Sequence, residues 1–194
     1  MSELMERLRG INKPTSVLYL DLDGTVRKGF DELGRFVNKR EDVEVFQEIP
    51  KILKLYKDNE WRIVAISNQG GIALGHVTFQ EMNHIMIETN RQCNYLFDKI
   101  AWCSHHPDAS TKEMAICWCR KPRIGLIVET VSDLSLEFGE YYPPHLSLFI
   151  GDRPEDKGCA ENANIEFIPA KIFREWTLKE HEELIKKIHS MHIE

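Results

Sequence analysis

No stretch of this 194-residue sequence approaches the roughly 18 consecutive apolar residues that a membrane-spanning helix needs. The first residues, Met1 to Arg7, also lack the basic and then apolar organisation of a secretory signal peptide. Internal repeats, low-complexity tracts and long linkers are absent as well. We therefore expect a soluble, cytoplasmic protein without membrane contacts. The length suits one well-buried domain over residues 1–194 better than two.

Positive charge is in short supply. The chain has 25 Lys and Arg residues against 31 Asp and Glu residues, which gives a formal net charge of −6 at pH 7. Non-specific binding to nucleic acid requires many Lys and Arg contacts to phosphates, so this balance argues against it. A small anionic ligand needs only local positive charge and remains compatible with the composition.

The sequence contains only five cysteines, which is an odd number. Three of the five lie between Cys103 and Cys119. A disulfide framework normally uses an even number of cysteines, whereas a tight cluster is typical of metal binding in a reducing compartment. Cys93 and Cys159 stand apart from the cluster, and we expect them to be small buried residues.

Apolar runs of strand length alternate with helical patterns along the chain. This alternation predicts an α/β fold with a central parallel sheet and crossover helices. The segment from residue 26 to residue 45 is polar and irregular, so we expect a flap near the site there and no inserted cap domain. The expected strands are residues 16–20, 61–66, 98–102 and 146–150 with an edge strand at 165–168, and the expected helices are residues 49–58, 78–95, 124–138, 156–164 and 177–191.

The motif Asp21-Leu-Asp-Gly-Thr25 directly follows the first expected strand. Open α/β sheets bind ligands at the carboxyl ends of their strands, which is where both aspartates fall. In a regular strand Asp21 and Asp23 would share a face, and two carboxylates that close repel unless a cation lies between them. A hard divalent ion with oxygen ligands, such as Mg²⁺, meets that need. For this motif alone, an acidic turn without catalytic function is the alternative.

Two further motifs supply groups that suit a phosphate. Ser67 and Asn68 follow the second expected strand and offer a hydroxyl and an amide to phosphate oxygens. Lys121, which precedes a proline, is a compact ammonium suited to neutralising phosphoryl oxygens. Arg120 and Arg123 beside it could grip a second anionic group, with solvated surface arginines as the alternative.

The fourth motif, Gly151-Asp152-Arg-Pro-Glu-Asp156, again places acids after an expected strand. In this order the four motifs resemble those of the haloacid dehalogenase superfamily over residues 17–168. The resemblance implies a Rossmann-like three-layer sandwich and a phosphatase in which Asp21 is the nucleophile and Asp23 the general acid and base. Only about forty residues separate the first two motifs, which points to the capless branch of the superfamily.

The same resemblance implies the remaining site residues. Mg²⁺ would be held by Asp21, Asp152 and the backbone carbonyl of Asp23, with Asp156 in support. Asp156 falls in the first turn of an expected helix, where the helix dipole also favours an acid. Lys121 would neutralise the phosphoryl oxygens. The expected phosphate-binding and substrate-binding residues are Thr25, Ser67, Asn68 and Arg120.

The cysteine cluster reads Cys103-Ser-His105-His-Pro107 and then Cys117-Trp-Cys119. Its thiols and a histidine supply the four ligands of a closed tetrahedral Zn²⁺ site, with free buried thiols as the alternative. The loop over residues 103–119 is similar to one in heptose bisphosphate phosphatases and histidinol-phosphate phosphatases, which implies structural zinc on Cys103, His105, Cys117 and Cys119. Spacing alone does not distinguish His105 from His106.

Two departures bear on the substrate. Leu74 stands where the heptose bisphosphate enzymes carry arginine, so a second phosphate would need Arg120, Arg123 or the flap pair Arg27 and Lys28. Residues 167–176 are faintly similar to the tail of polynucleotide 3′-phosphatases. We expect a phosphatase of carbohydrate metabolism that acts on a small phosphorylated metabolite, a sugar phosphate or a heptose bisphosphate-like compound. The alternatives are a polynucleotide 3′-phosphatase, a histidinol-phosphate phosphatase and a non-catalytic zinc-stabilised binding module. The oligomeric state stays open, and a monomer is compatible with the sequence.

Overall fold

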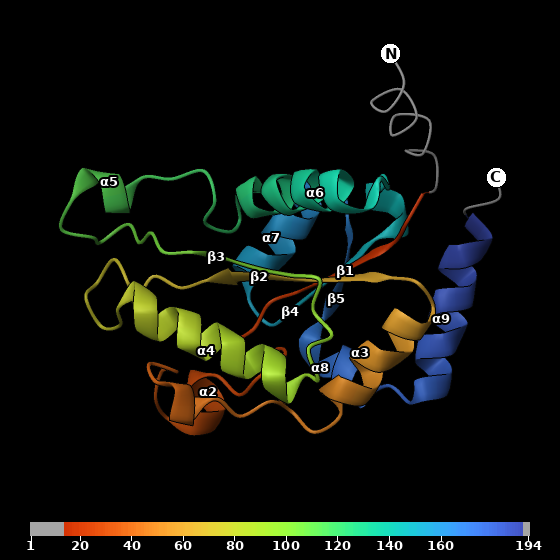
Figure 1. The fold of residues 1–194 in the computed structure, drawn as a ribbon, viewed down its shortest axis with the longest axis horizontal. Helices are drawn as coiled ribbons and strands as arrows, with labels where there is room; N and C mark the ends of the chain where they lie inside the picture. Colours follow the sequence, from red (N-terminus) through yellow and green to blue (C-terminus); the bar gives the residue numbers. More distant parts are fainter. Residues whose placement is uncertain (1–13, 192–194) are drawn as a thin grey trace, which may run out of the picture.

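The computed structural model describes residues 14–191, so Met1 to Arg7 lie outside the described residues. Its centre is a five-stranded sheet in the order β3-β2-β1-β4-β5, in which all neighbouring strands are parallel (Figure 1). The strands are β1 (Val17–Leu20), β2 (Arg62–Asn68), β3 (Lys99–Cys103), β4 (Leu148–Gly151) and β5 (Glu166–Pro169). The expected α/β fold with a central parallel sheet is confirmed.

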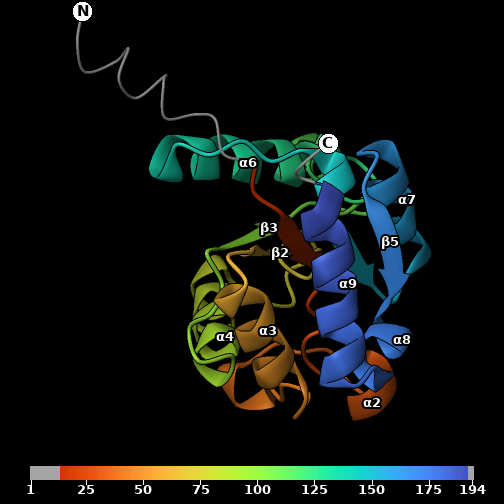
Figure 2. The ribbon, with the colours of Figure 1, turned by 90° about the vertical axis from the view of Figure 1, so that its right-hand side faces the viewer.

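Helices cover both faces of this sheet. The helices α3 (Ile49–Asp58), α4 (Phe79–Gln92) and α8 (Ala170–Glu175) lie on one face, and α6 (Gly125–Phe138) and α7 (Pro154–Asn162) lie on the other (Figure 1). The last helix, α9 (Leu178–Ser190), packs beside α3 (Figure 2). None of the helices within residues 14–191 is both long and apolar enough to cross a membrane.

The middle strand shows why the strands are apolar throughout. Leu18 and Leu20 of β1 belong to the core under α3 and α4, whereas Val17 and Tyr19 belong to the core under α6 and α7. Successive side chains of a strand point to opposite faces, and here both faces are covered by helices. The three-layer sandwich expected from the resemblance is therefore present.

The observed elements differ from the expected ones mainly at their ends. Helix α3 has the expected bounds, because its four apolar side chains are all buried on one face. Strand β2 runs two residues further than expected and includes Ser67 and Asn68, which pair with β3. Helix α8 and the four-residue helices α2 (Phe30–Leu33) and α5 (Lys112–Ala115) were not expected, since segments this short show little periodicity.

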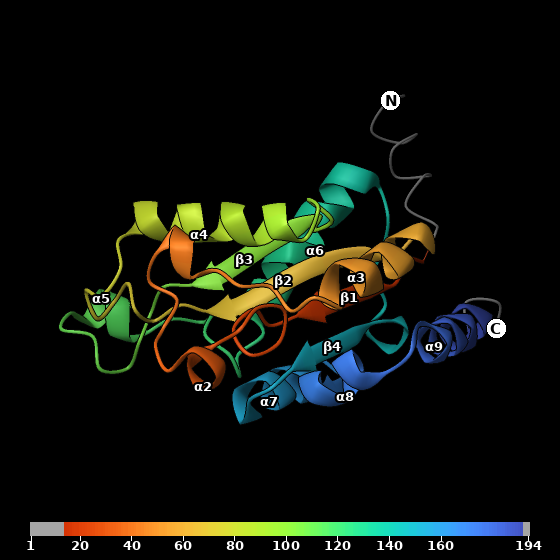
Figure 3. The same ribbon diagram turned by 90° about the horizontal axis from the view of Figure 1, so that it is seen from below.

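The segment from residue 26 to residue 45 forms a short folded flap. It contains α2 and the 3₁₀ turn η1 (Arg40–Asp42), and a backbone bridge between Arg27 and Val45 closes it at its base. The side chain of Gln92 in α4 donates to the Val43 carbonyl at 2.9 Å and accepts from the Val45 amide at 3.1 Å. Figure 3 shows α2 near the arrowheads of the strands, which is the carboxyl edge of the sheet.

Candidate active site

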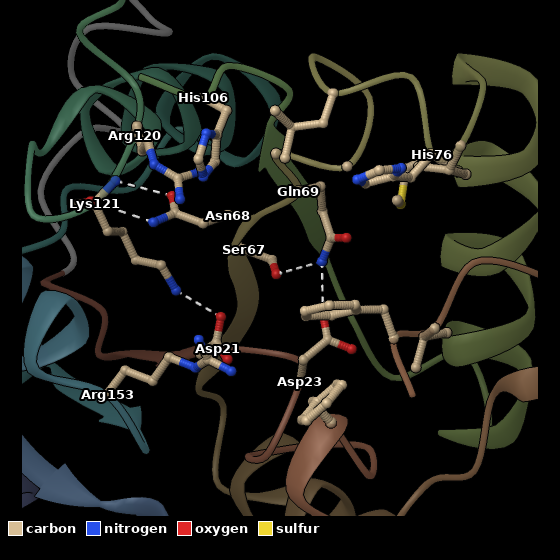
Figure 4. Close-up of a pocket in the computed structure, with 18 of the residues that line it drawn as sticks. Asp21, Asp23, Ser67, Asn68, Gln69, His76, His106, Arg120, Lys121 and Arg153 are labelled. Atoms are coloured by element: carbon tan, nitrogen blue, oxygen red, sulfur yellow. Dashed lines mark hydrogen bonds and ion pairs between the residues drawn. The ribbon is translucent and has the colours of Figure 1, made fainter. Parts of the chain in front are cut away.

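Side chains from four segments meet at the carboxyl edge of the sheet. Asp21 follows β1, Ser67 and Asn68 end β2, Lys121 follows the Cys/His loop, and Asp156 lies in the first turn of α7. All five line one cavity of about 310 Å³ (Figure 4). Parallel strands end at the same edge, so the sheet topology brings these distant motifs together.

Lys121 lies between two carboxylates. Its Nζ is 2.6 Å from Asp21 Oδ1, 2.6 Å from Asp156 Oδ1 and 2.7 Å from the Ile66 carbonyl oxygen. Although burial alone would lower it, the two carboxylates hold the pKa of Lys121 above its ordinary value, so the ammonium stays charged. Burial raises the pKa of Asp21 to about 7, against the lowering effect of Lys121.

Asp23 has a cation of its own. Arg27 donates from Nε to Asp23 Oδ1 at 2.8 Å and from Nη2 to Oδ2 at 3.1 Å, and Gln69 Nε2 donates to Oδ2 at 2.7 Å. Arg27 is fully buried, and its Nη1 donates to Thr89 Oγ1 of α4 at 2.7 Å. Although burial alone would raise it, Arg27 and Gln69 hold the pKa of Asp23 below its ordinary value. Each aspartate thus has a basic partner, Lys121 for Asp21 and Arg27 for Asp23.

Asn68 orients the backbone of Lys121. The Lys121 amide donates to Asn68 Oδ1 at 2.9 Å, and Asn68 Nδ2 donates to the Lys121 carbonyl at 3.2 Å. Ser67 Oγ accepts from Gln69 Nε2 at 2.9 Å, which leaves the hydroxyl proton free to be donated into the cavity. The Asn68 amide therefore contacts the Lys121 backbone, and both Ser67 and Asn68 line the cavity, where their binding of phosphate stays a prediction.

Thr25, which is expected to bind phosphate, does not line the cavity. The chain turns at Gly24, whose φ is 86°, and Thr25 follows that turn into the interior. Its hydroxyl is buried and has no hydrogen-bond partner among residues 14–191. Thr25 is therefore buried outside the cavity lining, and its role at the phosphate stays a prediction.

Three carboxylates form a group that fits a divalent cation. Oxygens of Asp21, Asp152 and Asp156 lie within 4.8 Å of one another. Burial and then Asp156 raise the pKa of Asp152 to about 6, which reflects carboxylates crowded without enough positive charge. A Cβ atom at Gly24 would overlap the Asp152 carboxylate, so glycine leaves room for this acid. Hard oxygen donors in this arrangement suit Mg²⁺.

The Cys/His loop brings four donor atoms together. Cys103 Sγ lies 3.6 Å from Cys117 Sγ and 3.0 Å from Cys119 Sγ, and His105 Nδ1 lies 3.5 Å from Cys103 Sγ. Three thiols and one imidazole nitrogen are a donor set typical of a closed tetrahedral zinc site. His106 lines the catalytic cavity instead, so the structure distinguishes the two adjacent histidines.

This loop leads directly into the catalytic cavity. The Arg120 amide donates to Cys117 Sγ at 3.4 Å, and Arg120 Nη1 donates to the His105 carbonyl at 3.0 Å. Arg120 lines the cavity, as expected, and Lys121 is the next residue. An ion that stabilises the loop would therefore also fix the positions of Arg120 and Lys121. Cys93 and Cys159 are buried and stand apart from the loop, as expected.

The cations suggested for a second anionic group are mostly engaged elsewhere. Arg27 is buried against Asp23, so its expected availability is wrong. Lys28 Nζ is 2.7 Å from a Glu44 carboxylate oxygen, and Arg123 Nη1 donates to the Cys117 carbonyl at 2.6 Å. Arg120 keeps its place at the cavity.

Several residues that line the cavity were not expected from the sequence. Arg153 stands inside the fourth motif and Gln69 directly follows Asn68, and those positions are the signal that could have identified them. Phe30 and Phe36 come from the flap, and His76 comes from the segment before α4. No local pattern marks these three, because the path of the flap and of the β2-to-α4 connection decides where they lie.

Comparisons with known proteins identify the family of this chain. A family model described as polynucleotide kinase 3 phosphatase matches residues 16–173. The D-glycero-D-manno-heptose-1,7-bisphosphate 7-phosphatase of Chlorobaculum tepidum is 31% identical over 156 residues, which span 78% of this chain and 76% of that protein. The D-glycero-beta-D-manno-heptose-1,7-bisphosphate 7-phosphatase of Haemophilus ducreyi is 28% identical, over 77% of this chain and 79% of that protein.

Solved structures show the same fold. The D,D-heptose 1,7-bisphosphate phosphatase from B. bronchiseptica, complexed with magnesium and phosphate, has a TM-score of 0.62 at 23% identity and covers 80% of this chain and 79% of its own. A HAD-like phosphatase from Mesorhizobium loti has a TM-score of 0.73 at 18% identity and covers 93% of this chain and 88% of its own. With the family model matching most of its length, the chain belongs to the polynucleotide kinase 3 phosphatase family of haloacid dehalogenase-like phosphomonoester hydrolases.

Proposed function

We propose that this protein is a Mg²⁺-dependent phosphatase that releases phosphate from a small phosphorylated sugar through an aspartyl-phosphate on Asp21. The observation that carries the proposal is the convergence of Asp21, Lys121 and Asp156 in one cavity, with Lys121 Nζ 2.6 Å from an oxygen of each carboxylate. The sugar as substrate is supported by the heptose bisphosphate phosphatases that this chain resembles over three quarters of its length.

In the first step a carboxylate oxygen of Asp21 attacks phosphorus. The new bond joins Asp21 Oδ to phosphorus while the bond from phosphorus to the sugar oxygen breaks, and Asp23 gives its proton to that departing oxygen. Lys121 and Ser67 face the phosphoryl oxygens and offset their negative charge. Asn68 serves the step indirectly, because its amide holds the Lys121 backbone.

In the second step Asp23 takes a proton from water, and the water oxygen attacks phosphorus. The bond from phosphorus to Asp21 breaks, which releases inorganic phosphate and restores both carboxylates. Arg27 and Gln69 favour the carboxylate form of Asp23, which is the form that accepts this proton. The same contacts make the protonated form a strong acid in the first step.

Two metal sites belong to the proposal. Asp21, Asp152 and the Asp23 carbonyl would hold Mg²⁺, with Asp156 in support, and the bound ion would offset the charge of the phosphate. The residues Cys103, His105, Cys117 and Cys119 would hold Zn²⁺, which would stabilise the loop before Arg120 and Lys121. All four zinc positions are filled by protein, so this ion would be structural.

A second candidate function is dephosphorylation of nucleic-acid 3′ ends. It is favoured by the description of the matching family model, polynucleotide kinase 3 phosphatase. The net charge of −6 disfavours it, because binding along a polymer needs many cations.

A phosphate-release assay distinguishes these candidates. The purified chain is assayed with Mg²⁺ and after EDTA treatment, on heptose 1,7-bisphosphate, histidinol phosphate, simple sugar phosphates and a 3′-phosphorylated oligonucleotide. We expect Mg²⁺-dependent release with a higher kcat/KM for a sugar phosphate than for histidinol phosphate or the oligonucleotide, and no release by Asp21→Asn. An oligonucleotide preferred by tenfold or more would replace the sugar proposal with the second candidate. No release from any phosphomonoester would refute the phosphatase assignment.

A further inference from the structure

The flap turns two exposed phenylalanine rings toward the catalytic cavity. The side chain of Phe30 in α2 is 44% exposed and that of Phe36 is 62% exposed, and both line the cavity that contains Asp21 and Asp23. Their ring centroids are 4.9 Å apart, with the ring planes tilted by 41°. Exposed apolar rings that sit together beside a polar site are typical of a ligand contact surface.

These rings belong to an apolar side of the cavity. Val37 of the flap lines it, together with Leu74 and Val77 from the segment that leads into α4 and Met82 from α4 itself. Figure 4 shows the basic side chains Arg120, Lys121 and Arg153 gathered on the other side, away from His76. The cavity thus has one side for an anion and one for an apolar surface.

A simple sugar phosphate would use only half of this cavity. Its phosphate suits Asp21 and Lys121, but its hydroxyl groups gain little from the faces of Phe30 and Phe36. A leaving group with a flat π-face would remove both rings from water. Asn38 and His76 also line the cavity and offer hydrogen-bond donors and acceptors to the polar edge of such a group.

We propose that Phe30 and Phe36 form a stacking platform for the nucleobase of a nucleoside monophosphate, so that a nucleoside is the preferred leaving group. A nucleobase combines a flat π-face with a polar edge, which matches the rings and the neighbouring Asn38 and His76. The ligand is a single nucleotide because the acidic chain lacks the cations that a polymer backbone needs. This inference rests on the proposed phosphatase function and names its substrate class.

The test removes the base from the substrate and the ring from the enzyme. The values of kcat/KM are measured for adenosine 5′-monophosphate, adenosine 3′-monophosphate and ribose 5-phosphate, with wild type, Phe36→Ala and Phe36→Trp. Stacking on an aromatic ring is worth enough per base to predict a wild-type preference of roughly tenfold for one adenosine monophosphate over ribose 5-phosphate. We expect Phe36→Ala to reduce that ratio to near one and Phe36→Trp to retain it.

The control is Phe79→Ala, which removes a ring of similar exposure, 55%, that does not line the catalytic cavity. It should leave the substrate ratio unchanged. A wild-type ratio near one, or a ratio that Phe36→Ala does not change, would overturn the stacking proposal. If ribose 5-phosphate is still hydrolysed in that case, the proposed phosphatase function is not affected. A 3′-phosphorylated oligonucleotide preferred tenfold over both mononucleotides would also overturn it. Absence of hydrolysis of every substrate would instead count against the phosphatase function itself.

Discussion

At the scale of single residues, the cation beside each aspartate distinguishes their chemistry. Asp21 contacts Lys121, which it shares with Asp156, and burial raises the pKa of Asp21 to about 7. Asp23, two residues further along the chain, pairs with Arg27. Although burial would raise it, the pKa of Asp23 lies below its ordinary value. The two aspartates therefore lie in different electrostatic environments, which suits Asp21 as a nucleophile and Asp23 as a general acid and base.

The nucleophile assignment predicts the effect of Asp21→Asn. The amide is nearly isosteric and still reaches Lys121, but it cannot form the aspartyl-phosphate. We expect kcat to fall by at least roughly 10³-fold with the folded structure retained. Steady-state kinetics and circular dichroism check this, and more than a few per cent of wild-type activity would contradict the assignment.

The contact between Arg27 and Asp23 predicts a positioning role for a residue that does not line the cavity. Lysine at position 27 keeps the charge but cannot make the two-pronged contact and the bond to Thr89 at once. Arg27→Lys should lower kcat roughly tenfold with little change in KM, because Asp23 loses its orientation for proton transfer.

The pH profile separates this role from a merely structural one. Weaker contacts to Arg27 should let the pKa of Asp23 rise, so the acidic limb of kcat should move to higher pH in Arg27→Lys. Arg40→Lys is the matched control, since Arg40 of the flap pairs with Glu88 of α4 and not with Asp23. If the acidic limb of kcat does not shift, Arg27 does not control the pKa of the group that titrates in that limb.

At the scale of elements, the Cys/His loop connects β3 to Lys121. If Cys117 is a zinc ligand, Cys117→Ser should lower bound zinc from about one ion per chain and lower the melting temperature. It should also lower kcat, because the Arg120 amide contacts Cys117 Sγ. Elemental analysis and calorimetry check this against Cys93→Ala, which alters a buried cysteine away from the loop and should keep the zinc. Full zinc content in Cys117→Ser would contradict the ligand set.

Helix α9 contains a buried histidine that makes folding sensitive to acid. His181 is fully buried against Phe173, Trp176 and Tyr56, and burial lowers its pKa from 6.5 to about 4. Between these values the unfolded chain binds a proton that the folded chain does not, so its stability falls as the pH drops from 6.5 towards 4.

Replacing this histidine should remove that loss. We expect the wild type to lose roughly 2 kcal/mol more than His181→Phe between pH 7 and pH 4.5, as measured by urea unfolding. His145→Phe, at an exposed position, is the control and should behave as the wild type. Equal acid sensitivity of wild type and His181→Phe would show that other groups dominate this range.

At the scale of the whole molecule, a net charge of −6 disfavours polyanions, whereas the local cations at the cavity suit a single phosphate. The kcat/KM for a small phosphomonoester should therefore fall less than roughly tenfold between 50 and 200 mM salt. A protein that grips six or more backbone phosphates would lose about 10³-fold or more over that range. A loss of that size would favour a polymer substrate.

The sequence by itself determined the layers and the edge at which the site forms. The expected bounds of α3 are confirmed, because its four apolar side chains repeat with the helical period and are all buried. Asp21, Ser67 and Asp156 could be placed together because they lie at the carboxyl ends of parallel strands or in the helix turn that follows one, whereas Lys121 was placed by the family resemblance. Short motifs carry this information locally.

Only the tertiary structure decided what each group touches. Arg27 pairs with Asp23, four residues before it, and is held at its other end by Thr89, 62 residues away, while Thr25 is directed inward by the turn at Gly24. The flap rings Phe30 and Phe36 reach the cavity through the path of a segment without helical or strand period. These outcomes depend on contacts between distant parts of the chain, and such contacts leave no periodic pattern in the sequence.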